Sequence, residues 1–152
     1  METMMRLIRP FFLVCTLAFY GNALAKMLVT KPSQHGPRET MDKLQEVIEQ
    51  KGMTIFKRID HQANAKAADK EMPAAEVLIF GNPKVGTQIM LCDLRAGLDL
   101  PVRVLVHQDP EGKTWISYHN LQSLKETYRM GACAAVDKME KALQTITDAA
   151  AN

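Results

Sequence analysis

Cysteine, excess charge of one sign and long apolar runs are all scarce in this chain of 152 residues. Its three cysteines include no Cys-x-x-Cys pair, which argues against thiol oxidoreductase chemistry. Lysine and arginine number 19 against 17 acidic residues, so the charge footprint of a nucleic-acid-binding protein is missing. The most apolar stretch, from Pro10 to Tyr20, is too short to cross about 30 Å of hydrocarbon. These absences favour a small soluble domain.

The N-terminal apolar stretch instead matches a secretory signal peptide. Arg6 and Arg9 supply the positive region in front of it, and Ala23 and Ala25 are small residues at the positions that a signal peptidase reads. We therefore expect residues 1–25 to be removed and the protein to be periplasmic or secreted. No later apolar segment is long enough to span a membrane.

The remaining segment, residues 26–152, is long enough for a single domain with its own core. It keeps two cysteines, Cys92 and Cys133. In an oxidising compartment they would form one disulfide that closes a loop of about forty residues and adds about 3–4 kcal/mol of stability. The alternative is two buried thiols that never meet, because spacing in the sequence does not place their Cα atoms.

Hydrophobic periodicity predicts the element order β-α-β-β-β-β-α, with small helices inserted. The clearest element is an amphipathic helix that begins at Pro37 and ends before Gly52. The last segment is helical from Leu121 onward, and Gly131 makes it either one bent helix or two. This order predicts an α+β fold, a mostly antiparallel sheet of about five strands with its helices packed on one face.

Two details of the strands can be predicted from alternation. Ile55, Lys57 and Ile59 are expected on one side of their strand. A hairpin is expected around the turn from Asp109 to Gly112. If those two residues face each other, Val106 lies opposite Trp115 and Val104 opposite Ser117, and Arg103, Leu105, His107, Thr114, Ile116 and Tyr118 share the other face.

Several motifs follow the first predicted helix. They are Ile59-Asp60-His61, Leu78 to Thr87 (LIFGNPKVGT) with Met90 after it, Gly97 to Pro101 (GLDLP), Leu105-Val106, the Asp109/Gly112 turn and Trp115 to Tyr118 (WISY). Together they resemble the widespread bacterial family called domain of unknown function 302, over nearly all of the chain that follows the signal.

The resemblance implies an α+β domain related in shape to the TATA-binding-protein-like or helix-grip folds, and it implies a homodimer. It supplies no catalytic residues. Members of the family often have an acidic or tryptophan-containing strand where this chain has His107-Gln108. Cys92 and Cys133 are not family features either, so any role of these positions is particular to this chain.

The segment from Gly81 to Thr87 is the first candidate for a binding site, because it leaves a buried strand and enters a helix. Backbone N–H groups at such a junction bind anions, and Lys84 adds a positive charge. It is not a P-loop, since Lys84 precedes Gly86 whereas the P-loop lysine follows a glycine. The structural alternative assigns the two glycines to tight turns, Asn82 to turn initiation and Thr87 to a helix cap.

Acid–base chemistry has two candidates. Asp60 and His61 stand together at a strand end, and Ser117 and His119 are two apart on a strand and share a face. In the alternative, Asp60 caps the following helix and Ser117 is a small residue in the sheet.

Histidine spacing argues against a metal site. The four histidines form no H-x-H or H-x-x-x-H pattern, so neither a metal nor a cofactor is expected. Aromatic residues on the predicted strands, Phe56, Phe80, Trp115 and Tyr118, either fill the core or border an apolar ligand between the sheet and its long helix.

These patterns favour an exported binding or accessory domain over an enzyme, dimeric and without nucleic-acid partners. Its ligand would be a small molecule or an anion at a site made of Asp60, His61, Gly81, Asn82, Lys84, Gly86 and Thr87. Two alternatives remain: a small hydrolase-like enzyme that uses the same loops, and a structural protein that dimerises through the uncovered face of its sheet.

Overall fold

The structure, a computed structural model, describes residues 27–152, so the predicted signal peptide lies outside the described residues. Its elements are β1 (Leu28–Pro32), α2 (Pro37–Gln50), β2 (Thr54–Asp60), α3 (His61–Ala67), β3 (Ala75–Gly81), α4 (Pro83–Cys92), the 3₁₀ helix η1 (Leu94–Leu98), β4 (Val102–Gln108), β5 (Thr114–His119), α5 (Gln122–Thr127) and α6 (Ala134–Ala151). Within the described range, no helix combines the length and the apolar character needed to cross a membrane.

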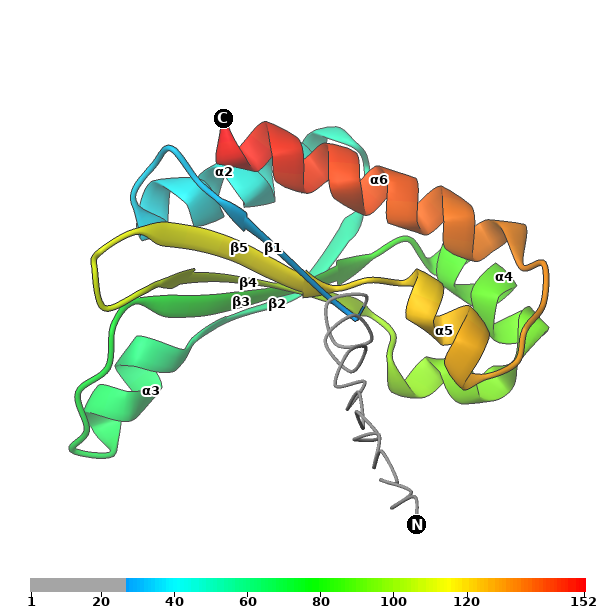
Figure 1. The fold of residues 1–152 in the computed structure, drawn as a ribbon, viewed down its shortest axis with the longest axis horizontal. Helices are drawn as coiled ribbons and strands as arrows, with labels where there is room; N and C mark the ends of the chain where they lie inside the picture. The colour runs from blue at the N-terminus through cyan, green and yellow to red at the C-terminus, as the bar shows by residue number, and fades with distance from the viewer. Residues whose placement is uncertain (1–26) are drawn as a thin grey trace, which may run out of the picture.

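All five strands form one antiparallel sheet in the order β1-β5-β4-β3-β2. Helices α2 and α6 lie side by side across one face of this sheet (Figure 1). Helices α4 and α5 gather at one end of the long axis, and α3 extends from the other end (Figure 1). The predicted α+β fold, with a five-stranded antiparallel sheet and helices on one face, is confirmed.

The core lies between the sheet and helices α2 and α6. Each strand contributes alternate residues and each helix contributes an apolar stripe, as the period of each element requires. The largest fully buried side chains are Met41, Leu44, Ile48, Leu78, Phe80, Ile89, Val104, Val106, Ile116, Val136, Leu143 and Ile146. Helix α2 begins at Pro37 and is followed by Gly52 at a φ of +64°, which matches the predicted bounds.

The turn of the β4–β5 hairpin is one residue longer than predicted. The backbone N–H of Asp109 donates to the carbonyl of Lys113, so residues 110–112 form a three-residue loop. Gly112 has a φ of +83°, the left-handed conformation that glycine adopts without steric cost and that closes such loops.

The longer loop shifts the predicted register of the hairpin by one residue. Val106 lies opposite Ile116, not Trp115. Because a one-residue slip moves every side chain to the other face, the predicted sharing of a face by Ile116, Tyr118 and Arg103 was wrong. Ile116 and Tyr118 are buried in the core with the valines of β4, and Arg103 faces away from it.

A bulge in β2 overturns a second prediction about the strands. The register of β2 against β3 shifts between Ile55 and Lys57, which leaves Phe56 unpaired and 51% exposed. An extra residue in one strand reverses the side-chain alternation beyond it. Ile55 therefore packs against the core, while Lys57 and Ile59 point to the other side.

The C-terminal helical segment consists of two helices, α5 and α6, rather than one bent helix. Arg129 and Gly131 both have positive φ, at +52° and +59°, so the chain between the helices cannot continue a right-handed turn.

We call the sheet face covered by α2 and α6 the helix face, and the opposite one the open face. From the strand pairing, the side chains on the open face are Lys57, Ile59, Ala75, Val77, Ile79, Arg103, Leu105, His107, Trp115, Ser117, His119, Leu28, Thr30 and Pro32. The open face thus mixes apolar residues with basic and hydroxyl side chains.

Candidate functional site

An apolar pocket of about 330 Å³ lies at the end of the molecule where α4 is found. Its walls come from the β2 bulge, the β3–α4 junction, α4, the turn that leads into β4, and α6. It is lined by Phe56, Gly81, Asn82, Pro83, Gly86, Thr87, Met90, Gly97, Leu100, Pro101, Val102 and Met139. Apolar side chains dominate, and Asn82 and Thr87 carry the only polar side chains of this lining. Such a surface suits an apolar ligand with few polar groups.

The β3–α4 junction satisfies its own backbone donors. Asn82 caps α4 by accepting from the N–H groups of Lys84 and Val85, at 3.0 and 3.4 Å. Pro83, at the first helical position, has no N–H, and the N–H of Gly86 donates to the carbonyl of Asn82 at 2.8 Å. No donor of the first helical turn is left free, so the junction lacks the groups that the predicted anion cradle needs.

Helix α4 begins at Pro83, four residues before Thr87, and this changes the roles of the motif residues. Asn82 is the cap, and Thr87 lies inside the helix, so its predicted capping role was wrong. Gly81 and Gly86 both have negative φ, so neither is required for a turn. A Cβ atom at Gly86 would have nothing within 4 Å, which shows that this glycine leaves open space at the pocket wall.

A disulfide joins Cys92 to Cys133, with 6.3 Å between their Cα atoms. Cys92 is the last residue of α4, and Cys133 directly precedes α6. Both helices line the apolar pocket, α4 with Met90 and α6 with Met139. The disulfide therefore ties together two walls of the pocket.

Asp60 and His61 do not belong to this pocket. Asp60 pairs with Glu76 at one end of β3, and Thr54 pairs with Gly81 at the other end. At about 3.3 Å per residue, the five steps from Glu76 to Gly81 put the two ends about 17 Å apart. The seven predicted site residues thus fall into two groups that one small ligand cannot contact together.

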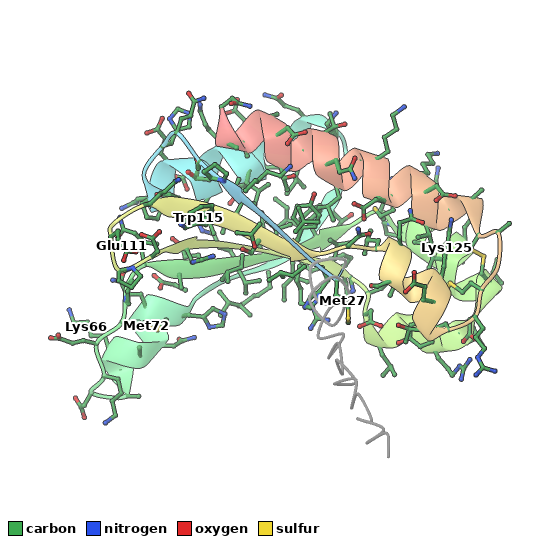
Figure 2. All side chains as sticks on the ribbon, in the orientation of Figure 1. Met27, Lys66, Met72, Glu111, Trp115 and Lys125 are labelled. Carbon is green, nitrogen blue, oxygen red and sulfur yellow. A yellow bond between two sulfur atoms is a disulfide. The ribbon has the colours of Figure 1, made fainter. Side chains whose placement is uncertain are left out.

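Asp60 has a structural role, since its carboxylate accepts from the N–H of Ala63 at 2.8 Å and caps α3. The shallow depression beside it is lined in part by Lys66 and Met72. Figure 2 shows those two side chains on the arm around α3, at the opposite end of the molecule from Lys125 on α5. Lys84, although near the apolar pocket in the chain, is exposed and does not line it.

Ser117 has a different histidine partner from the predicted one. Its hydroxyl lies 3.2 Å from Nε2 of His107 and 3.0 Å from the hydroxyl of Thr30. The correct hairpin register reveals this pairing, which the predicted register hid. Ser117 is only 8% exposed and lines none of the described pockets, so the geometry indicates a hydrogen bond that joins strands.

The residues that make the apolar pocket were mostly missed by sequence reasoning. Met90, Leu100 and Met139 come from three separate segments, and each reads as an ordinary core residue in the sequence. Phe56 is the one of the four aromatic residues considered for an apolar ligand that lines the pocket. The available signal was the pair of glycine-containing motifs, since the FGNPKVGT and GLDLP segments meet at the pocket.

A chain of polar contacts lies where α4, η1 and the end of α5 meet. Arg95 pairs with Asp93 at 2.7 Å and stacks over the ring of Tyr128, whose hydroxyl donates to Asp99 at 2.6 Å. The hydrogen bond to Asp99 raises the pKa of Tyr128, and the bond from Arg95 lowers the pKa of Asp93. This network ties η1 to the end of α5.

Within residues 27–152, no three His, Cys, Asp or Glu side chains converge in a way that would hold a metal ion.

Fold and pocket together define a small α+β domain with one antiparallel sheet, helices on one of its faces and a single disulfide among its described residues. The chain belongs to the family described as domain of unknown function DUF302, whose model matches residues 29–146. The predicted family membership is therefore confirmed.

A solved structure shows the same fold. The crystal structure of an uncharacterised conserved DUF302 protein from Bacillus stearothermophilus has a TM-score of 0.75 to this chain at 21% sequence identity. The match covers 82% of this chain and 98% of that one.

The curated relatives are longer proteins. A fluoride-specific ion channel, FluC 1, of Brucella suis biovar 1 (strain 1330) is 36% identical over 126 residues, which is 82% of this chain and 50% of the relative. FluC 1 of Brucella abortus biovar 1 (strain 9-941) matches at 36% identity over 47% of its length. The chain therefore spans about half the length of the curated relatives it matches.

Proposed function

We propose that the protein is an exported binding domain that holds a small, mainly apolar molecule in the pocket between α4 and α6. The observation that carries this proposal is the pocket itself, about 330 Å³ in volume and lined mostly by apolar side chains. A pocket of that size with a mostly apolar lining is the usual form of a small-molecule site. Thr87 supplies one hydroxyl to orient a polar group of the ligand.

The lining favours an apolar ligand over the predicted anion. Every N–H of the first turn of α4 is engaged within the chain, and Lys84 points elsewhere. It also favours binding over catalysis, because none of the described residues that line the pocket carries a carboxylate, imidazole or thiol to act as acid, base or nucleophile.

Export and accessory roles complete the proposal. The signal peptide predicted over residues 1–25 would deliver the domain, covering residues 26–152, to the periplasm or the medium. An accessory role agrees with the relatives, in which a segment like this chain makes up half of a protein named a fluoride-specific ion channel. We expect the protein in the periplasmic fraction, with the intact mass of a chain that begins at Lys26.

Gly86 offers a direct test of the pocket. In Gly86→Leu the new side chain enters the open space at the pocket wall, and Gly86→Ala adds only a methyl group there. Both substitutions replace a glycine inside a helix. For Gly86→Ala, this change is expected to raise the free energy of unfolding by about 0.5–1 kcal/mol. The probe is N-phenyl-1-naphthylamine, an uncharged dye that fluoresces in apolar sites. We expect the leucine variant to bind it at least ~10-fold more weakly than the alanine variant.

Equal dye binding by the two variants would place the dye elsewhere and remove the support for this pocket. A native mass spectrum of the protein purified from the periplasm of a Gram-negative host gives the mass of any ligand that stays bound. We expect the unchanged protein and Gly86→Ala to carry a non-covalent adduct that Gly86→Leu lacks.

A further inference from the structure

The open face of the sheet carries positive charge without any carboxylate. The strand pairing places Lys57, Arg103, His107 and His119 on it, and the acidic strand residues lie elsewhere. Glu76 pairs with Arg58 on the helix face, and Asp60 caps α3. The chain as a whole is nearly neutral, so this face is a local concentration of basic groups.

Arg103 and His119 are immediate neighbours on that face. Val104 pairs with Tyr118. Because the strands are antiparallel, Arg103, which precedes Val104, lies opposite His119, which follows Tyr118. Ile79 flanks Arg103 on the far side, and Leu28 flanks His119. Neither Arg103 nor His119 forms an ion pair with a carboxylate of residues 27–152. A guanidinium and an imidazole ring therefore lie side by side, with no carboxylate of these residues paired to either.

Both side chains line a second pocket, of about 380 Å³, where β4 begins and β5 ends. Its apolar floor consists of Val102, Leu121 and Leu124, which are all buried. The rest of its lining is Met27, Asp99, Arg103, His119, Asn120, Ser123, Thr127 and Tyr128. Figure 2 shows Met27 where the chain enters β1, on the rim of this region. The lining of this pocket therefore combines three buried apolar side chains with two exposed basic ones.

We propose that this second pocket is a binding site for a small organic anion, a carboxylate or phosphate ester, whose charged group is held between Arg103 and His119. The planar guanidinium of Arg103 matches two oxygens of such a group, and the ring of His119 supplies a further donor. The apolar remainder of the anion packs on Val102, Leu121 and Leu124.

Asp99 sets the selectivity of the site. It is the single carboxylate of the lining, and its Oδ2 atom is already occupied by the hydroxyl of Tyr128 at 2.6 Å. Its other oxygen repels a second negative charge and accepts from a hydroxyl or ammonium group. Small hydroxy acids and phosphorylated alcohols therefore fit better than compact inorganic anions or polyanions.

Arg103→Gln and Lys57→Gln form a matched pair for the test. Both remove one positive charge from the same row of the open face, but only Arg103 lines the pocket. The purified protein is titrated with lactate and with glycerol 3-phosphate at constant ionic strength, and the ring signals of His119 are followed by NMR. We expect a saturable shift in these signals. Arg103→Gln should weaken the affinity for the anion on the order of 10-fold, and Lys57→Gln should weaken it less than about twofold.

If the two variants lose the same amount of anion affinity, the attraction is non-specific and the proposal is overturned. The lack of a saturable shift with either anion overturns it as well. The stronger of the two titrations identifies the charged group. If circular dichroism shows that Arg103→Gln is unfolded, His119→Gln is titrated by calorimetry instead. Its affinity for the anion should fall on the order of 10-fold, and a loss equal to that of Lys57→Gln overturns the proposal. Gly86→Leu, which blocks the apolar pocket, leaves this titration unchanged, so the two sites succeed or fail independently.

Discussion

At the scale of single residues, Asp109 controls the hairpin turn that sets the register of β4 and β5. Its carboxylate accepts from the indole N–H of Trp115 at 2.6 Å and from the N–H of Lys113 at 2.8 Å. The bond from Trp115 is the main cause that lowers the pKa of Asp109 below its ordinary value. A lowered pKa means that the folded state prefers the charged carboxylate. This contribution to stability is complete above the ordinary value of about 3.9 and is lost as the pH falls through the lowered one.

The corresponding prediction compares Asp109→Asn with the unchanged protein. The variant keeps one oxygen acceptor but has no ionisable group, so its melting temperature at pH 7 is expected to be lower. Between pH 4 and pH 2 the difference between the two proteins is expected to narrow, because the unchanged protein loses its advantage when Asp109 is protonated. Melting curves by circular dichroism at each pH measure this. A difference that stays constant down to pH 2 would show that the charge of Asp109 does not contribute.

At the scale of elements, the disulfide is the main covalent constraint on the apolar pocket. It closes a loop with a sequence separation of 41 residues between α4 and α6. Cys92→Ser is expected to reduce the free energy of unfolding by about 3–4 kcal/mol, since the unfolded chain is no longer cross-linked. Because the bond also ties two walls of the pocket, the variant should bind N-phenyl-1-naphthylamine more weakly at temperatures where it stays folded.

Reductant provides the control for this prediction. The unchanged protein in a phosphine reductant is expected to match Cys92→Ser in both denaturant midpoint and dye affinity, and the variant should not respond to the reductant. If reduction changes stability but leaves dye binding intact, the disulfide stabilises the fold without shaping the pocket.

Elements were also the scale at which the sequence was most informative. The period of apolar residues located α2 and the strands because one face of each is buried in the core, as Met41 and Leu44 are. The errors arose where one residue changed the local geometry, at the bulge of Phe56 and at the loop closed by Gly112. Periodicity cannot detect such single insertions, because both strands alternate equally well in either register.

The candidate site was harder to predict for a related reason. Motif residues near the pocket were found because they are close together in the sequence, as Gly81 and Thr87 are. Met139, which completes the pocket, is more than fifty positions away and looks like any other residue of an amphipathic stripe. Residue type alone associates Asp60 and His61 with the loop, whereas the strand register places them at the far end of the sheet.

At the scale of the whole molecule, two surfaces are candidates for the homodimer that the family resemblance implies. The open face is a poor choice, because a symmetric dimer through it would set Arg103 and Lys57 against the same basic face of the second copy. The α4–η1 surface has the opposite character. Leu91 of α4 and Leu94 and Leu98 of η1 are 77%, 79% and 80% exposed, and apolar surface of this kind favours an interface between proteins.

We therefore predict that a second copy of the chain covers these three leucines. Leu94→Glu is expected to convert the dimer to a monomer in light scattering coupled to size-exclusion chromatography, because the interface would have to bury an unpaired carboxylate. Leu28→Glu is the matched control, since Leu28 lies on the open face with 48% of its surface exposed, and it should leave the dimer intact. The reverse result would move the dimer to the open face, where it would cover the Arg103–His119 pocket and turn the proposed anion into a ligand shared by two subunits.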